Sequence, residues 1–372
     1  MNIFKYFQGF AKSGYTVTNI CLLNLKKYKF TTYSPQINKI KSRYSTCKLT
    51  NSSQIFIISS SFLFNLFKPD NEKEKDDVEE LKMTIKRSIL LIQKEEFLKA
   101  EQMLHIALRQ AQILQHYDGI TYVYDVMANL AYNRNDFKKA EKLFLSVLKR
   151  LMAKGIPEND LAIIHISLKI ADICDKKGDI KKAETGYKFC LEHLQSNLTK
   201  DSENKDVLQL LGLSLEKYAC MLFSQSRYTA AHKYFIQAYY ICIKINGEEN
   251  EQTVVLLNDL GSVNYMLQNY DKAIEYLTKA TKIGNINTYI YVYLSFSTIS
   301  KCFNKFLGKK FPDMIDLGFI HVNLGNTLIE KGLYEEAKLN CSKGERLAKN
   351  ENNQKSMSEA KECLEKIKSL IS

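Results

Sequence analysis

The sequence predicts an all-α fold, a right-handed superhelix of about six helical hairpins with long repeats. The 372 residues include only 15 Gly and 4 Pro, which leaves room for long uninterrupted helices. A phrase with an Ala between two larger residues, such as NDFKKAEKLF around Ala140, occurs six times, and a second small residue stands twelve positions before each such Ala. Small residues at two fixed places in every unit indicate paired antiparallel helices that cross closely.

The six units follow one another between residues 80 and 350. The recurring Ala residues are Ala100, Ala140, Ala183, Ala231, Ala273 and Ala337, and the small residues before them are Ser88, Ala128, Ala171, Ala219, Gly261 and Gly325. Polar or Gly-bearing text (NRND, KKGD, SQSR, LQN, EKG) predicts the turn inside a unit. This is the tetratricopeptide pattern, and the Ala spacings of 40, 43, 48, 42 and 64 exceed its commonest period of about 34.

The 64-residue spacing between Ala273 and Ala337 contains extra sequence. Removing the 23 residues INTYIYVYLSFSTISKCFNKFLG leaves 64 − 23 = 41, close to the other spacings. Residues 285–308 are therefore either an extra helix or translated intron sequence from a gene model, with the second favoured. Residues 351–372 are predicted to form a C-terminal helix.

The positive charge is concentrated before the repeats. Residues 1–69 contain ten Lys or Arg and no Asp or Glu, whereas after Pro69 the balance is 53 − 10 = 43 basic against 41 acidic residues. Because phosphate binding needs a basic face on the folded part of the chain, this distribution argues against a nucleic-acid partner.

The acid-free leader has the composition of a mitochondrial transit peptide over residues 1–44, although it is rich in Lys rather than Arg. In a helical leader, Phe4 and Phe7 would share one face. Arg43 stands two residues before Ser45, which predicts cleavage between Tyr44 and Ser45. A disordered basic tail is the alternative.

Residues 45–79 hold an apolar segment and then a charged linker. The segment Ile55–Phe67, IFIISSSFLFNLF, is shorter than the roughly 20 residues that a membrane-spanning helix needs. A single membrane anchor and a segment that only rests on a membrane or on protein both stay open.

Cysteine and histidine usage gives no sign of a metal or redox site. The nine Cys form no C-x-x-C pair, and those at apolar positions, such as Cys174 and Cys341, are predicted to be reduced, buried thiols. The six His never take metal-ligand spacing, and no phosphate-binding loop, nucleophile elbow or paired-carboxylate cleft is found. We therefore expect no metal, no cofactor and no enzymatic activity.

Whole phrases between the repeat landmarks resemble a mitochondrial family of tetratricopeptide repeat proteins. They are ITYVYDVMANLAYNRNDFKKAEKLF, LAIIHISLKIADICDKKGDIKKAETGYKFCLEHL and GEENEQTVVLLNDLGSVNYMLQNYDKAIEYL, and the resemblance covers residues 80–284 and 311–350. It implies a mitochondrial inner-membrane protein that helps assemble and maintain respiratory complex III. Such a protein binds subunits of the complex and promotes clearance of Rieske-subunit fragments.

A partner-binding groove is expected on the inner face of the first helix of each unit. The residues predicted to line it are Asp125, Asn129, Tyr132, Asn258, Ser262, Tyr265 and Asn326. Exposed Asn129 and Asn326 can offer both a donor and an acceptor to an extended peptide. A solvated polar face is the alternative. Leu168 and Asp172 stand where a carboxylate clamp needs cationic or amide side chains, which argues against a chaperone-tail receptor.

The alternatives to a complex III scaffold are a soluble adaptor and a hydrolase. A soluble adaptor would use the same groove for a cytosolic cargo or motor partner. A hydrolase of Rieske fragments would need a nucleophile paired with a base, and the sequence offers none.

Overall fold

The structure is a computed structural model that describes residues 75–296 and 316–371. Within these ranges it contains thirteen α-helices and no strand. The predicted transit peptide, its cleavage site, the apolar segment Ile55–Phe67 and the second half of the extra sequence lie outside the described residues.

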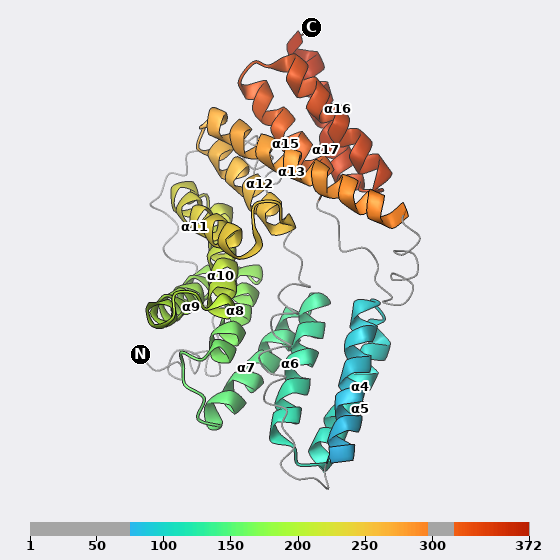
Figure 1. Cartoon of the computed structure of the whole chain (residues 1–372), viewed down its shortest axis with the longest axis vertical. Helices are drawn as coiled ribbons and strands as arrows, with labels where there is room; N and C mark the ends of the chain where they lie inside the picture. Colours follow the sequence, from blue (N-terminus) through green and yellow to red (C-terminus); the bar gives the residue numbers. More distant parts are fainter. Residues whose placement is uncertain (1–74, 297–315, 372) are drawn as a thin grey trace, which may run out of the picture. The chain divides into compact units, whose positions relative to one another are not determined.

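Twelve of the helices form six consecutive pairs (Figure 1). The pairs are α4 (Lys75–Gln93) with α5 (Phe97–Ile113), α6 (Tyr117–Asn133) with α7 (Phe137–Ala153), α8 (Leu161–Lys176) with α9 (Ile180–Lys200), α10 (Lys205–Ser224) with α11 (Tyr228–Asn246), α12 (Glu251–Met266) with α13 (Tyr270–Phe296), and α15 (Leu317–Glu330) with α16 (Tyr334–Asn350). The first helix of each pair is called its A helix and the second its B helix.

Each A helix packs against its own B helix, and each A helix after α4 also packs against the B helix of the preceding pair. Contacts between elements distant in the sequence are few, so the repeats stack one after another as in a solenoid. The all-α fold of repeated hairpins that the sequence predicts is confirmed.

The turn inside every pair has the same backbone shape. The residue two positions before each B helix lies in the left-handed region, with φ between +60° and +81°. These residues are Glu95, Asn135, Gly178, Ser226, Gln268 and Gly332. In two of the turns the next residue, Asp136 or Asp179, accepts a hydrogen bond from a backbone N–H in the first turn of the B helix. The polar segment that the sequence predicts to be a turn thus reverses the chain direction in three residues.

The recurring small residues lie at the crossings between A and B helices. All six Ala residues of the B helices are fully buried. A Cβ built on Gly261 would come 2.5 Å from Cγ of Leu277, and one on Gly186 would come 2.8 Å from Cβ of Ala171. The helices therefore approach so closely that only a small residue fits at these points.

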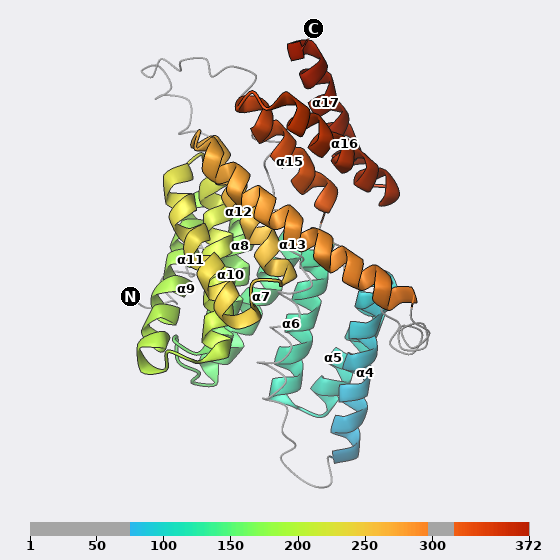
Figure 2. The same ribbon diagram turned by 45° about the horizontal axis from the view of Figure 1, so that its top comes forward.

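The fifth B helix is longer than the others. α13 extends without a break to Phe296, so the first part of the surplus segment 285–308 continues this helix. The last described helix, α17 (Gln354–Ile371), lies in the predicted C-terminal segment and packs on α15 and α16 (Figure 2).

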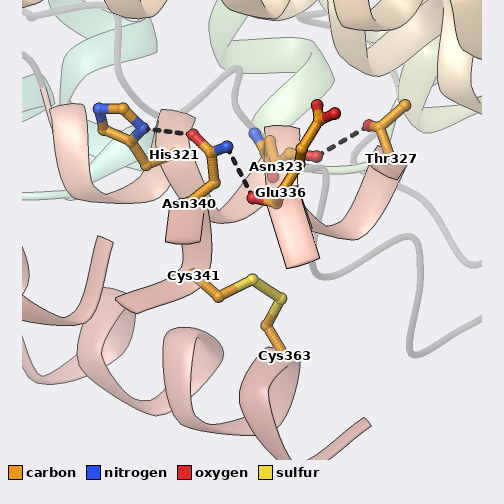
Figure 3. The surroundings of a disulfide bond; sticks show 7 residues. All are labelled: His321, Asn323, Thr327, Glu336, Asn340, Cys341 and Cys363. Atoms are coloured by element: carbon orange, nitrogen blue, oxygen red, sulfur yellow. Dashed lines mark hydrogen bonds between the residues drawn. A yellow bond between two sulfur atoms is a disulfide. The ribbon is translucent and has the colours of Figure 1, made fainter. Parts of the chain in front are cut away.

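One cysteine prediction was wrong. Cys341 of α16 and Cys363 of α17 form a disulfide bond (Figure 3), whereas Cys174, Cys190 and Cys242 are buried free thiols. The sequence pattern marked Cys341 as an apolar core position, which it is, but it did not show that α17 folds back and places a second thiol beside it.

Among the described residues, α10 is the one helix with the length and apolar composition of a membrane span. Of that span, 78% is buried inside the protein, as in the core helix of a repeat array. This helix is therefore weak evidence for a membrane crossing.

Candidate partner-binding face

A stripe of polar residues follows the A helices from repeat to repeat. We define the A-helix stripe as Asp125, Asn129, Tyr132, Lys169, Asp172, Lys176, Glu216, Lys217, Asn258, Ser262, Tyr265, Asn323 and Asn326. All of these residues except Lys176 occupy positions around the small residue that recur in the A helices, so the repeat itself aligns them.

The first part of the stripe joins α6 to α8 through a buried ion pair. Nζ of Lys169 lies 3.4 Å from Oδ1 of Asp125, and both side chains are at most 2% exposed. The side-chain amide of Asn129 donates to the backbone carbonyl of Asp125 at 2.7 Å and to its carboxylate at 3.1 Å. Nζ of Lys169 also stands 5.0 Å from the ring centroid of Phe144.

The second part of the stripe joins α6, α8 and α10. The hydroxyl of Tyr132 donates to the carboxylate of Asp172 and accepts from Nζ of Lys176. Burial alone would raise the pKa of Asp172, but the positive charges of Lys217 and Lys176 and the bond from Tyr132 hold that pKa below its ordinary value. Burial, together with the carboxylate of Asp172, raises the pKa of Tyr132, so its hydroxyl keeps its proton.

The third part of the stripe joins α12 to α15. The side-chain amide of Asn323 donates to Oδ1 of Asn258 at 2.9 Å, although the two residues are 65 positions apart. Ser262 donates to the backbone carbonyl of Asn258 at 2.8 Å, and Tyr265 donates to Glu330 at 3.4 Å. An amide pair therefore replaces the ion pairs of the earlier repeats.

The predicted exposure of Asn129 and Asn326 was wrong, because their exposed fractions are only 5% and 7%. Asn129 is held by its bonds to Asp125 on its own helix. Asn326 lies on α15, which is packed by α12, α13, α16 and α17. Of the seven residues predicted to line a groove, six are buried, and only Tyr265 is partly exposed.

The sequence prediction named residues on the A helices but missed the lysines that lie beside them. Lys169, Lys217, Asp259 and Asn323 each stand two residues before the small residue of their A helix. The prediction considered the positions three before, one after and four after the small residue. Including the position two before would have revealed the buried lysines.

Most of the stripe is satisfied by its own bonds, but two buried groups are not. Oε1 of Glu216 and Nδ2 of Asn258 have no hydrogen-bond partner, and they occupy equivalent positions in consecutive repeats. A buried acceptor and a buried donor without partners are the groups able to recognise a ligand. Among the described residues no cluster of His, Cys, Asp or Glu is arranged to hold a metal ion.

Known proteins resemble the chain in sequence and in fold. A tetratricopeptide repeat family model matches residues 210–285. The tetratricopeptide repeat protein 19 homolog, mitochondrial, of Drosophila melanogaster is 37% identical over 87% of this chain and 81% of its own length. Tetratricopeptide repeat protein 19, mitochondrial, of Danio rerio is 32% identical over 66% of this chain and 64% of its own length.

A solved structure shows the same fold at low sequence identity. BtubC (BKLC) from P. vanneervenii superposes with a TM-score of 0.52 and 18% identity, covering 70% of this chain and 92% of its own. At this identity the likeness concerns the arrangement of helices alone.

Proposed function

Since the chain belongs to the tetratricopeptide repeat protein 19 family, we propose that it is a mitochondrial scaffold that helps assemble and maintain respiratory complex III. In this proposal it is associated with the inner membrane, binds subunits of the complex and promotes clearance of Rieske-subunit fragments. The single observation that carries the proposal is the 37% identity to a mitochondrial relative over 87% of the chain.

Two features of the chain support this proposal. The leader up to Tyr44 is free of acidic residues, as transit peptides are. The A-helix stripe provides a polar face that runs across consecutive repeats, as tetratricopeptide repeats use for protein partners. The bound peptide would contact this face through the two atoms without hydrogen-bond partners, Oε1 of Glu216 and Nδ2 of Asn258.

The test uses cells of the source organism in which the gene is deleted. Full-length tagged chain is expected to restore complex III activity, to co-purify with the complex and to prevent accumulation of Rieske fragments. A chain that starts at Ser45 keeps every described repeat but lacks the leader, so it is the matched control and is expected to fail.

The outcomes separate this function from the cytosolic adaptor. The mature protein recovered from mitochondria should begin at or near Ser45. Recovery of the tagged chain only in the mitochondria-free cytosol, or rescue by the leaderless control from the cytosol, would overturn the proposal.

A further inference from the structure

A cavity of about 300 Å³ lies between α10, α11 and α12, where the fourth and fifth repeats meet. Its apolar walls are formed by Leu208, Leu213, Ile241, Ile245 and Leu256. Gly212 and Ala238 keep it open, since a Cβ on Gly212 would already come 3.3 Å from Cγ2 of Ile241. We refer to this cavity as the inter-repeat cleft.

Glu216 brings a carboxylate to the wall of the inter-repeat cleft. Its side chain is 2% exposed, and Oε2 accepts a hydrogen bond of 2.6 Å from Nε2 of Gln252. The second oxygen, Oε1, is buried without a hydrogen-bond partner. Burial raises the pKa of Glu216 to about 7, although Lys217 and the bond from Gln252 act in the opposite direction. A buried acceptor left unpaired is unfavourable, so a ligand that donates a hydrogen bond to Oε1 satisfies it.

The other polar groups at the cleft are amides. Gln209, Asn246, Asn250 and Gln252 line it, and none of the described lining residues is Lys, Arg or His. A ligand that needs oxygen acceptors is therefore favoured over one that carries a negative charge.

We propose that the inter-repeat cleft binds an ammonium group on a short aliphatic stem, with the ammonium donating to Oε1 of Glu216 and the stem lying against Ile241, Ile245 and Leu256. Such a group has two sources, the lysine side chain of a bound protein or a free alkylamine. The first source rests on the proposed function, whereas the second does not.

The inter-repeat cleft suits both the aliphatic stem and the ammonium group of this ligand. A lysine stem has four methylenes and routinely buries them along apolar surface while its charged end finds oxygen acceptors. The bond between an ammonium and a carboxylate is charge-assisted, and it is stronger than a bond to a neutral group. A volume of about 300 Å³ is at the lower end of typical ligand pockets and accommodates such a stem.

The direct test titrates the full-length chain with n-butylammonium chloride and follows the methyl resonances of Ile241 and Ile245 by nuclear magnetic resonance. We expect saturable shifts of both methyl groups. n-Butanol, which has the same stem without the charge, should bind more weakly by about 10- to 100-fold, the factor for one hydrogen bond to a charged group.

Three variants assign the binding to Glu216. Glu216→Gln should weaken n-butylammonium by about 10- to 100-fold while leaving the helical content and the weak n-butanol binding unchanged. Gly212→Leu fills the cleft and should abolish both. Glu203→Gln removes the same charge from an exposed side chain just before α10 and should bind like the wild type.

The outcomes show whether the inter-repeat cleft binds an ammonium group and whether that group comes from a partner protein or a free amine. Absence of shifts in the wild type, or equal binding of n-butylammonium to the wild type and Glu216→Gln, would overturn it. Loss of complex III co-purification in folded Glu216→Gln identifies a partner lysine, whereas retained co-purification with lost amine binding identifies a free amine. If the wild type itself does not co-purify with complex III, the proposed function fails while the titration still judges the cleft.

Discussion

Two glycine substitutions with the same chemistry are expected to have different effects on stability. Gly261→Ala and Gly212→Ala both place a methyl group in the interior of an A helix, where Ala is favoured over Gly by about 1 kcal/mol. The difference comes from the neighbours. The new Cβ at position 261 would lie 2.5 Å from Cγ of Leu277, a fully buried side chain, whereas at position 212 the nearest atom is the Cγ2 methyl of Ile241 at 3.3 Å.

The magnitudes follow from these clearances. A Cβ at 2.5 Å forces Leu277 or the two helices to move, and overpacking of this kind costs about 1–3 kcal/mol. Subtracting the helix gain leaves Gly261→Ala destabilised by about 0–2 kcal/mol. Gly212→Ala needs a shift of only a few tenths of an ångström at the edge of the inter-repeat cleft and should be neutral or stabilised by up to about 1 kcal/mol.

The assay is urea unfolding of the full-length chain followed by far-ultraviolet circular dichroism. Gly261→Ala should have the lower free energy of unfolding of the two variants, by up to about 3 kcal/mol. Equal stability, or a more stable Gly261→Ala, would refute the reasoning that close helix crossing, and not helix propensity, selects glycine at this repeat position.

Three further effects are expected from single sites. Ala140→Leu should lower the free energy of unfolding by about 1–3 kcal/mol in the same urea assay, because Ala140 is fully buried at a helix crossing. Cys341→Ser should lower it by about 3 kcal/mol under oxidising conditions and by much less in reductant, because a disulfide with a sequence separation of 22 restricts the unfolded chain. Burial lowers the pKa of His321 to about 4, so the unfolded chain binds more protons between about pH 4 and 6.5, and stability should fall as the pH drops through this window. Comparing the urea midpoints of wild type and His321→Gln at about pH 5 and about pH 7 isolates this contribution, and parallel changes in both proteins would contradict it.

The fold was predictable because each repeat carries its own geometric requirement. A small residue such as Ala140 and its partner Ala128 recur at fixed places, since two helices cannot cross closely otherwise. The position of the turn inside each repeat was predictable for the same reason, from its polar or Gly-bearing sequence. In fact, residues such as Glu95 and Gln268 accept the left-handed backbone there without being glycine.

The candidate site was less predictable because its contacts join different repeats. Asn258 meets Asn323 across 65 positions, and Lys169 meets Asp125 across 44. Helical periodicity shows which face a residue occupies, but it does not show which residues the stacking brings opposite one another. Burial of Asn129 likewise follows from its bonds to Asp125 and from packing, neither of which a period of 3.6 residues reveals.

The disulfide bond between Cys341 and Cys363 makes the two ends of the repeat array unequal in their resistance to opening. In a linear stack each repeat is held only by its neighbours, so opening begins at the ends and moves inward. The bond ties α17 to α16 and closes one of the two ends of the described array. Amide hydrogen exchange and protease cleavage in the oxidised protein are therefore expected to advance from α4 toward the C-terminus, and to begin at both ends once the bond is reduced.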